Sequence, residues 1–166
     1  YHPINEYKYT NLLSTLMTIQ NSLNVLTQEI AQKGKGVFAI RDFSKGETVL
    51  VGRMVQVLSH RNPHSIQVDF DVHVLMDEPA VWLNHCCLPN TGVRNNQFGA
   101  YDFVALVDIA EGDEITFDYE TTETAFAADF QFTCNAPQCR KKLCGFFHLP
   151  PSLHTQYGDF IADYLK

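Results

Sequence analysis

Two blocks of the sequence carry most of its reactive side chains and constrain the fold more than any other stretch. The first block, residues 84–90, reads Asn-His-Cys-Cys-Leu-Pro-Asn and directly follows an apolar run. The second block, residues 112–119, begins with a Gly-Asp turn and continues with alternating Ile115, Phe117 and Tyr119, which predicts a strand with a phenol at its end. This much chemistry is unusual for plain loops, so we expect an active site where the two blocks meet.

Short apolar segments separated by turns occupy most of the remaining chain. They predict strands at residues 37–40, 48–51, 55–58, 65–70 and 73–76, and two more between residues 93 and 109 that join at a turn over 95–97. Apolar residues recur every three or four positions in residues 9–21 and again near 157–165, which predicts a helix at each end of the chain, with a strand directly after the first. The pattern therefore favours a mostly β fold with minor α content.

Composition indicates one globular domain, because 45% of the residues are hydrophobic and only 19% are charged. No apolar run approaches the roughly 20 residues of a membrane helix, and we find no signal peptide, so we expect an intracellular protein, cytoplasmic or nuclear, without membrane contact. The first residue is not Met, and we expect the chain to start inside a longer gene product.

The net charge of −7 argues against direct nucleic-acid binding, which requires clustered Lys and Arg. An acidic surface suits a basic partner, although it serves solubility equally well.

Two smaller features leave alternatives open. Gly34 and Gly36 precede an apolar strand, where they allow either a close approach of a ligand to the backbone or a simple β-turn. The five cysteines are odd in number, and three of them stand near one another at Cys134, Cys139 and Cys144. This spacing is atypical of a secreted disulfide framework and more typical of metal ligands or reactive thiols.

Four segments in order make the sequence similar to one family. Residues 34–39 resemble a GxG motif, residues 41–47 its following turn, residues 84–90 an NHxCxPN signature, and residues 112–119 a GEE(L/I)xxDY signature. Over residues 23–147 the chain thereby resembles the SET-domain protein lysine methyltransferases, in particular their small stand-alone microbial members. The resemblance implies several small sheets with a knot-like crossing. It divides the chain into an N-terminal helical extension (1–22), a SET domain (23–125), a post-SET-like cysteine tail (126–147) and a C-terminal helical segment (148–166).

The resemblance also implies an activity, the transfer of a methyl group from S-adenosyl-L-methionine to a lysine of a histone-like or other basic protein. Tyr119 would be the catalytic residue, and Phe117 and Tyr119 would line the channel for the substrate lysine. Glu114 and Asp118 would be structural rather than acid–base groups. The residues implied in cofactor binding are Gly34, Lys35, Gly36, Asn84, His85, Tyr119 and Phe146.

Structural zinc is a second cofactor that the resemblance implies. The family takes three cysteine ligands from its tail and a fourth from the NHxC segment. Cys87 of that segment and Cys134 and Cys139 of the tail match three of them, whereas Phe132 stands in place of the first tail cysteine. Cys144 is then the candidate for the missing ligand, and buried free thiols are the alternative. Cys86 is expected to be merely buried.

One departure favours a different function. Residues 49–58 lack the tyrosine-containing strand that is common upstream in the family. The alternative to an enzyme is therefore a catalytically weak SET-like module that binds a protein partner, with the N-terminal helix making a homodimer or partner contact.

Overall fold

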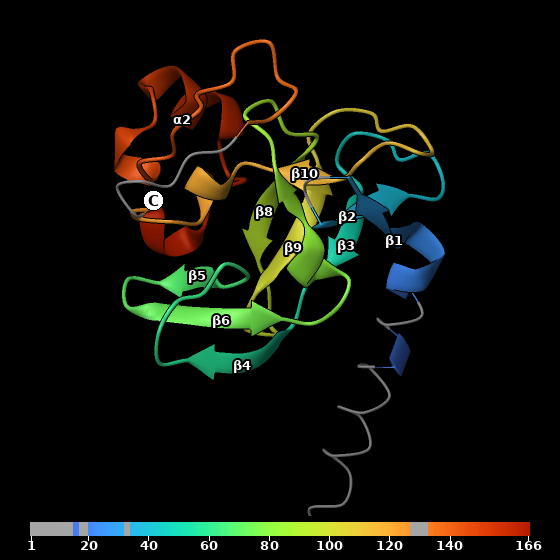
Figure 1. Cartoon of the computed structure of the whole chain (residues 1–166), viewed down its shortest axis with the longest axis horizontal. Coiled ribbons are helices and arrows are strands. Elements are labelled where there is room, and N and C mark those ends of the chain that lie inside the picture. The colour runs from blue at the N-terminus through green and yellow to red at the C-terminus, as the bar shows by residue number, and fades with distance from the viewer. Residues whose placement is uncertain (1–14, 17–19, 32–33, 127–132) are drawn as a thin grey trace, which may run out of the picture.

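The computed structural model describes residues 15–16, 20–31, 34–126 and 133–166, and within these it is built from several small sheets (Figure 1). Two of the sheets have three strands. The first has the order β3 (Thr48–Val51), β9 (Tyr101–Ala105) and β8 (Thr91–Asn95), and the second β4 (Met54–Leu58), β6 (Val72–Met76) and β5 (Ile66–Asp69). The other two are the antiparallel pair β1 (Val25–Ile30) and β2 (Gly34–Ala39) and the parallel pair β7 (Asn84–His85) and β10 (Thr116–Phe117).

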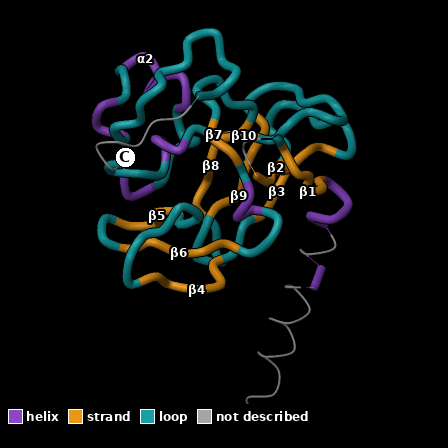
Figure 2. Tube along the Cα trace, in the orientation of Figure 1, coloured by secondary structure: helices purple, strands orange, loops and turns teal. Residues whose placement is uncertain are grey.

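Helical structure is short and lies mostly near the ends of the chain (Figure 2). The single described α-helix with assigned bounds is α2 (Pro151–Tyr157), and four 3-10 turns cover Ala80–Trp82, Tyr119–Thr121, Phe146–His148 and Asp163–Leu165. The predicted mostly β class is therefore confirmed. Among the described residues, no helix has the length and apolarity needed to span a membrane.

The strand predictions are confirmed to within a few residues, but three boundaries differ. The predicted helix over residues 9–21 lies largely outside the described residues, and its described positions are helical, as are residues 21–24. The C-terminal helix ends at Tyr157, because Gly158 follows with a positive φ of 53°. The strand of the second block stops at Phe117, since the Asp118 side chain accepts the Glu120 amide and starts a 3-10 turn at Tyr119.

Strand β9 is the centre of the core. Its residues Tyr101, Phe103 and Ala105 lie on one face, as predicted, and are almost completely buried, and Val104 on the other face is buried as well. The Tyr101 hydroxyl donates to the Gln67 carbonyl at 2.6 Å, which ties this sheet to β5 of the other three-stranded sheet. The core thus holds both larger sheets in fixed positions around the two signature blocks.

Candidate functional site

The two signature blocks meet, as predicted, in the short parallel pair of β7 and β10. Asn84 is aligned with Thr116 and His85 with Phe117. Asn90 closes the junction, because its side-chain oxygen accepts the Thr116 amide at 2.9 Å while its side-chain nitrogen donates to the Glu114 carbonyl at 2.9 Å. Both asparagines of the first block are therefore anchored on the second block.

Asn84 also fixes the glycine-containing strand β2 to this junction. Its side-chain nitrogen donates to the Lys35 carbonyl at 3.1 Å and to Glu114 Oε1 at 2.8 Å. A Cβ on Gly36 would lie 2.4 Å from Ile30 Cδ1 and 3.1 Å from both the Asn84 nitrogen and the Glu114 oxygen. Glycine is thus needed at position 36 to accommodate the Asn84–Glu114 pair, and the predicted structural role of Glu114 is confirmed.

A cavity of about 1050 Å³ opens beside the junction. Its volume is at the upper end of the range typical of small-molecule sites. Five of the predicted site residues line it: Gly34, Lys35, Asn84, Phe117 and Tyr119. Residues 61–66 and the segment at 122–126 complete the wall. The residues predicted for a cofactor and those predicted for a lysine channel therefore share one space.

Trp82 is a cavity residue that the sequence patterns did not single out. The Lys35 ammonium lies 4.6 Å from the centre of the Trp82 ring, at cation–π distance. The indole Nε1 is buried without a hydrogen-bond partner among the described residues.

Tyr119 is held at both its hydroxyl and its backbone. The hydroxyl donates to the Leu83 carbonyl at 2.8 Å, and the amide donates to His85 Nδ1 at 3.1 Å. The ring packs on Phe117, with 4.9 Å between ring centroids. Burial is the main cause that raises the pKa of Tyr119 above its ordinary value, so the side chain is a neutral phenol. The sequence could not identify the Leu83 carbonyl as the partner of this hydroxyl, because every residue has a backbone carbonyl.

Three residues predicted to bind the cofactor do not line the cavity. Gly36 is buried behind it, and the His85 ring faces Cys87 instead, with Nε2 at 3.3 Å from Cys87 Sγ. Phe146 belongs to the hydrophobic core and stacks on His154, with 4.4 Å between ring centroids. Its predicted place over an adenine ring would require the tail to rearrange.

A buried ionic network joins the second block to the cysteine tail. Both carboxylate oxygens of Asp118 accept from Arg140 at 2.7 Å, and Asp118 Oδ2 also accepts from the Tyr157 hydroxyl at 2.8 Å. Arg140 Nε lies 2.9 Å from Glu120 Oε2. The Asp118 side chain is fully buried, so its predicted structural role is confirmed.

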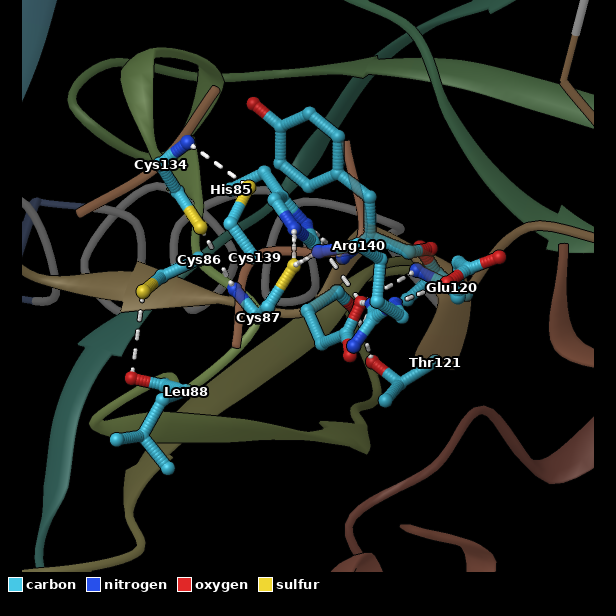
Figure 3. Close-up of polar contacts among 12 residues, drawn as sticks. His85, Cys86, Cys87, Leu88, Glu120, Thr121, Cys134, Cys139 and Arg140 are labelled. Atoms are coloured by element: carbon cyan, nitrogen blue, oxygen red, sulfur yellow. Dashed lines mark hydrogen bonds and ion pairs between the residues drawn. The ribbon is translucent and has the colours of Figure 1, made fainter. Parts of the chain in front are cut away.

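Cys87, Cys134 and Cys139 lie close to His85, next to this network (Figure 3). The ligand atoms of His85, Cys87 and Cys134 all lie within 4.8 Å of one another. Cys139 is adjacent, because its sulfur accepts the Cys134 amide at 3.4 Å. Imidazole and thiolates are the ligands that Zn²⁺ prefers, so this donor set fits the metal.

Cys144 takes no part in the group of ligand atoms within 4.8 Å; its amide donates to Glu120 Oε1 at 2.7 Å. Cys86 is only partly buried, and its thiol donates to the Leu88 carbonyl at 3.3 Å. Burial, followed by the charge of Arg140, lowers the pKa of His85 to about 3, so its imidazole is neutral. The candidate site thus has two parts, a cavity on one side of Tyr119 and a sulfur cluster on the other.

Comparisons with known proteins agree with this geometry. Residues 34–120, just over half of the chain, match the family model described as SET domain. KRYPTONITE, crystallised with mCHH DNA, an H3(1–15) peptide and SAH, superposes with a TM-score of 0.55 at 22% identity, over 72% of this chain and 29% of that chain. KRYPTONITE in complex with mCHG DNA and SAH superposes with a TM-score of 0.54 at 23% identity, over 72% of this chain and 28% of that chain. No curated protein matches the sequence. At these identities the solved structures show a shared fold.

Proposed function

The chain belongs to the SET-domain family, and on this premise we propose that it transfers a methyl group from S-adenosyl-L-methionine to a lysine side chain of a protein. The observation that carries the proposal is the single cavity in which Gly34, Lys35 and Asn84 face Phe117 and Tyr119. The KRYPTONITE structures contain SAH, the demethylated product of the proposed cofactor. The chain spans under a third of the length of those proteins, so their substrates are a guide to experiments only.

The cofactor, when bound, supplies an electrophilic methyl group on a sulfonium. Gly34 has a φ of 80°, and nothing lies within 4 Å of where its Cβ would be, so the backbone at this end of the cavity is open to a ligand. The Lys35 ammonium offers a donor to the polar amino-acid portion. Asn84 keeps this wall in place through its bonds to Lys35 and Glu114.

Tyr119 is the residue proposed to orient the acceptor amine. Its proton is directed to the Leu83 carbonyl, so the hydroxyl oxygen is left as an acceptor for an N–H of the substrate lysine. Phe117 provides an apolar wall that suits the four-carbon stem of lysine. The free ammonium has a pKa near about 10.4, and burial in the cavity would lower it and release the amine lone pair. Most of the acceleration would then come from proximity and alignment.

Calorimetric titration of the purified chain with S-adenosyl-L-methionine, and then with its demethylated product, tests the cofactor half of this proposal. Saturable binding near one equivalent is expected, and Asn84→Ala should weaken it because the Lys35 wall loses its anchor. Absence of binding to a folded wild-type chain would contradict the enzyme and favour the alternative, a SET-like module that binds a protein partner.

Methyl transfer to basic proteins, beginning with histone H3 peptides, tests the catalytic half. Tyr119→Phe removes the hydroxyl while preserving the ring packing on Phe117, so it should spare cofactor binding and lower turnover. Unchanged turnover in Tyr119→Phe would refute the role of that hydroxyl. The net charge of −7 leads us to expect a basic substrate, and an acidic one would count against the electrostatic part of the argument.

A further inference from the structure

Three sulfur atoms of the cluster each accept a backbone amide. Cys87 Sγ accepts from Arg140 at 3.3 Å, Cys134 Sγ from Cys87 at 3.5 Å, and Cys139 Sγ from Cys134 at 3.4 Å. Hydrogen bonds from the surrounding shell are a regular feature of metal ligands, and an amide donor stabilises a thiolate more than a thiol. Two backbone amides of the tail and one of the first signature block are therefore placed to stabilise thiolates at these three sulfur atoms.

A structural zinc site needs a fourth ligand, and the sequence does not supply it where the family does. Phe132 cannot ligate a metal, and it lies outside the described residues. His85 Nε2 lies 3.3 Å from Cys87 Sγ, within the group whose ligand atoms are all closer than 4.8 Å. Ligand atoms of a tetrahedral site with Zn–S of about 2.3 Å and Zn–N of about 2.0 Å stand roughly 3.5 to 3.8 Å apart. His85, Cys87 and Cys134 are already near this spacing, whereas Cys139 is outside their group and its side chain would have to move toward them.

We propose that His85 replaces the missing cysteine and completes a Cys₃His zinc site with Cys87, Cys134 and Cys139. This inference goes beyond the proposed methyl transfer and does not depend on it. The site would fasten the cysteine tail to the first signature block. It also gives the imidazole a structural role.

The surroundings of His85 can support the metal-bound tautomer. In the metal-free arrangement Nδ1 accepts the Tyr119 amide, so the ring proton is on Nε2 and points at Cys87 Sγ. Binding through Nε2 moves the ring proton to Nδ1, so the Tyr119 amide gives up Nδ1 as its acceptor. Each of the three thiols releases its proton to solvent as a Zn–S bond forms. Asp118 Oδ1, at 3.5 Å from Nδ1, can then accept the new N–H. A carboxylate behind a metal-bound histidine is the usual arrangement.

Two other cysteines are rivals for the fourth position. Cys86 is next to His85 in sequence, but its thiol is directed to the Leu88 carbonyl. Cys144 is five residues after Cys139, but its amide and that of Gly145 are bound by Glu120 Oε1, which fixes this turn to the acidic network. Both rivals would give a site with four sulfur ligands, so counting the sulfur atoms separates them from His85.

Zinc K-edge absorption of the full wild-type chain, purified with zinc present, makes that count without any mutation. One zinc per chain is expected, with three sulfurs at about 2.3 Å and one nitrogen at about 2.0 to 2.1 Å. Four sulfurs would overturn the proposal in favour of Cys86 or Cys144. Substoichiometric zinc in a folded protein would overturn it in favour of free thiols.

Matched variants then assign the nitrogen to a residue. His85→Ala should lower zinc affinity, measured by chelator competition, by more than the roughly 10–100-fold that loss of an outer partner costs. Cys86→Ser and Cys144→Ser should leave the affinity unchanged. Unchanged affinity in His85→Ala, or loss of a ligand in either serine variant, would overturn the assignment. If His85→Ala does not fold, the sulfur count of the wild-type chain still decides.

Discussion

Arg140→Ala is the substitution for which the structure predicts the clearest loss of stability. Arg140 is the cation that faces the buried carboxylates of Asp118 and Glu120, whose side chains are 0% and 3% exposed. Removing one partner of a buried ion pair costs about 3–5 kcal/mol, because an uncompensated charge stays buried.

The remaining hydrogen bonds place the expected cost at the lower end of this range. Asp118 keeps the Tyr157 hydroxyl, and Glu120 keeps the amides of Cys144 and Gly145. We therefore expect a loss of about 3 kcal/mol, which for a chain of this length lowers the melting temperature by roughly 6 to 12 °C. The effect should be similar at low and moderate salt, because the pair is shielded from solvent.

Urea denaturation and thermal melting of the wild type and the variant measure this cost. Arg94→Ala is the matched control, because Arg94 pairs with Asp102 at 3.1 Å but its side chain is 54% exposed. Exposed pairs of this kind contribute about 0.2–1 kcal/mol. If Arg140→Ala loses no more stability than Arg94→Ala, the buried network is not what fixes the tail, and the reasoning fails.

Two further predictions test the packing of the tail and of the core. Gly145→Ala should destabilise by on the order of 3 kcal/mol or more, because φ is 104° and the new Cβ would lie 2.2 Å from the Thr124 carbonyl oxygen. Gly112→Ala, with φ of 89° and open space around the Cβ, is its control, and equal losses would contradict the close crossing. Burial raises the pKa of Tyr101 above the ordinary value of about 10. The contribution of Tyr101 to the free energy of unfolding is therefore complete below pH 10, and it declines above pH 10 because this tyrosine ionises in the unfolded chain. Between pH 10 and 11 the wild-type stability in urea should therefore fall by about 1 kcal/mol more than that of Tyr101→Phe, and parallel curves would refute this.

The features that the sequence predicted best are those with local causes. The strands follow from alternation and turn residues, and the meeting of the two blocks follows from the family signatures. The buried face of β9, with Tyr101, Phe103 and Ala105, is a direct consequence of the two-residue period of a strand. A site where the two blocks meet was likewise expected, because both blocks deliver Asn84, Phe117 and Tyr119 to the same junction.

Predictions that depended on side-chain direction were less reliable. Extending the second strand to Tyr119 ignored the capping preference of Asp118, whose carboxylate accepts the Glu120 amide and turns the chain. Phe146 was expected at a ligand surface as an aromatic in the tail, yet its ring is buried in the core. A ring that can bury most of its area will do so unless another group holds it at the surface.

His85 shows why a signature alone does not assign the role of a residue. The resemblance implies that His85 binds the cofactor, whereas its ring lies beside the sulfur atoms of Cys87 and Cys134. These two cysteines are far apart in sequence and meet only after the tail folds back. The position of His85 Nε2, 3.3 Å from Cys87 Sγ, is therefore what allows the proposal that His85 takes the place of the ligand that Phe132 cannot supply.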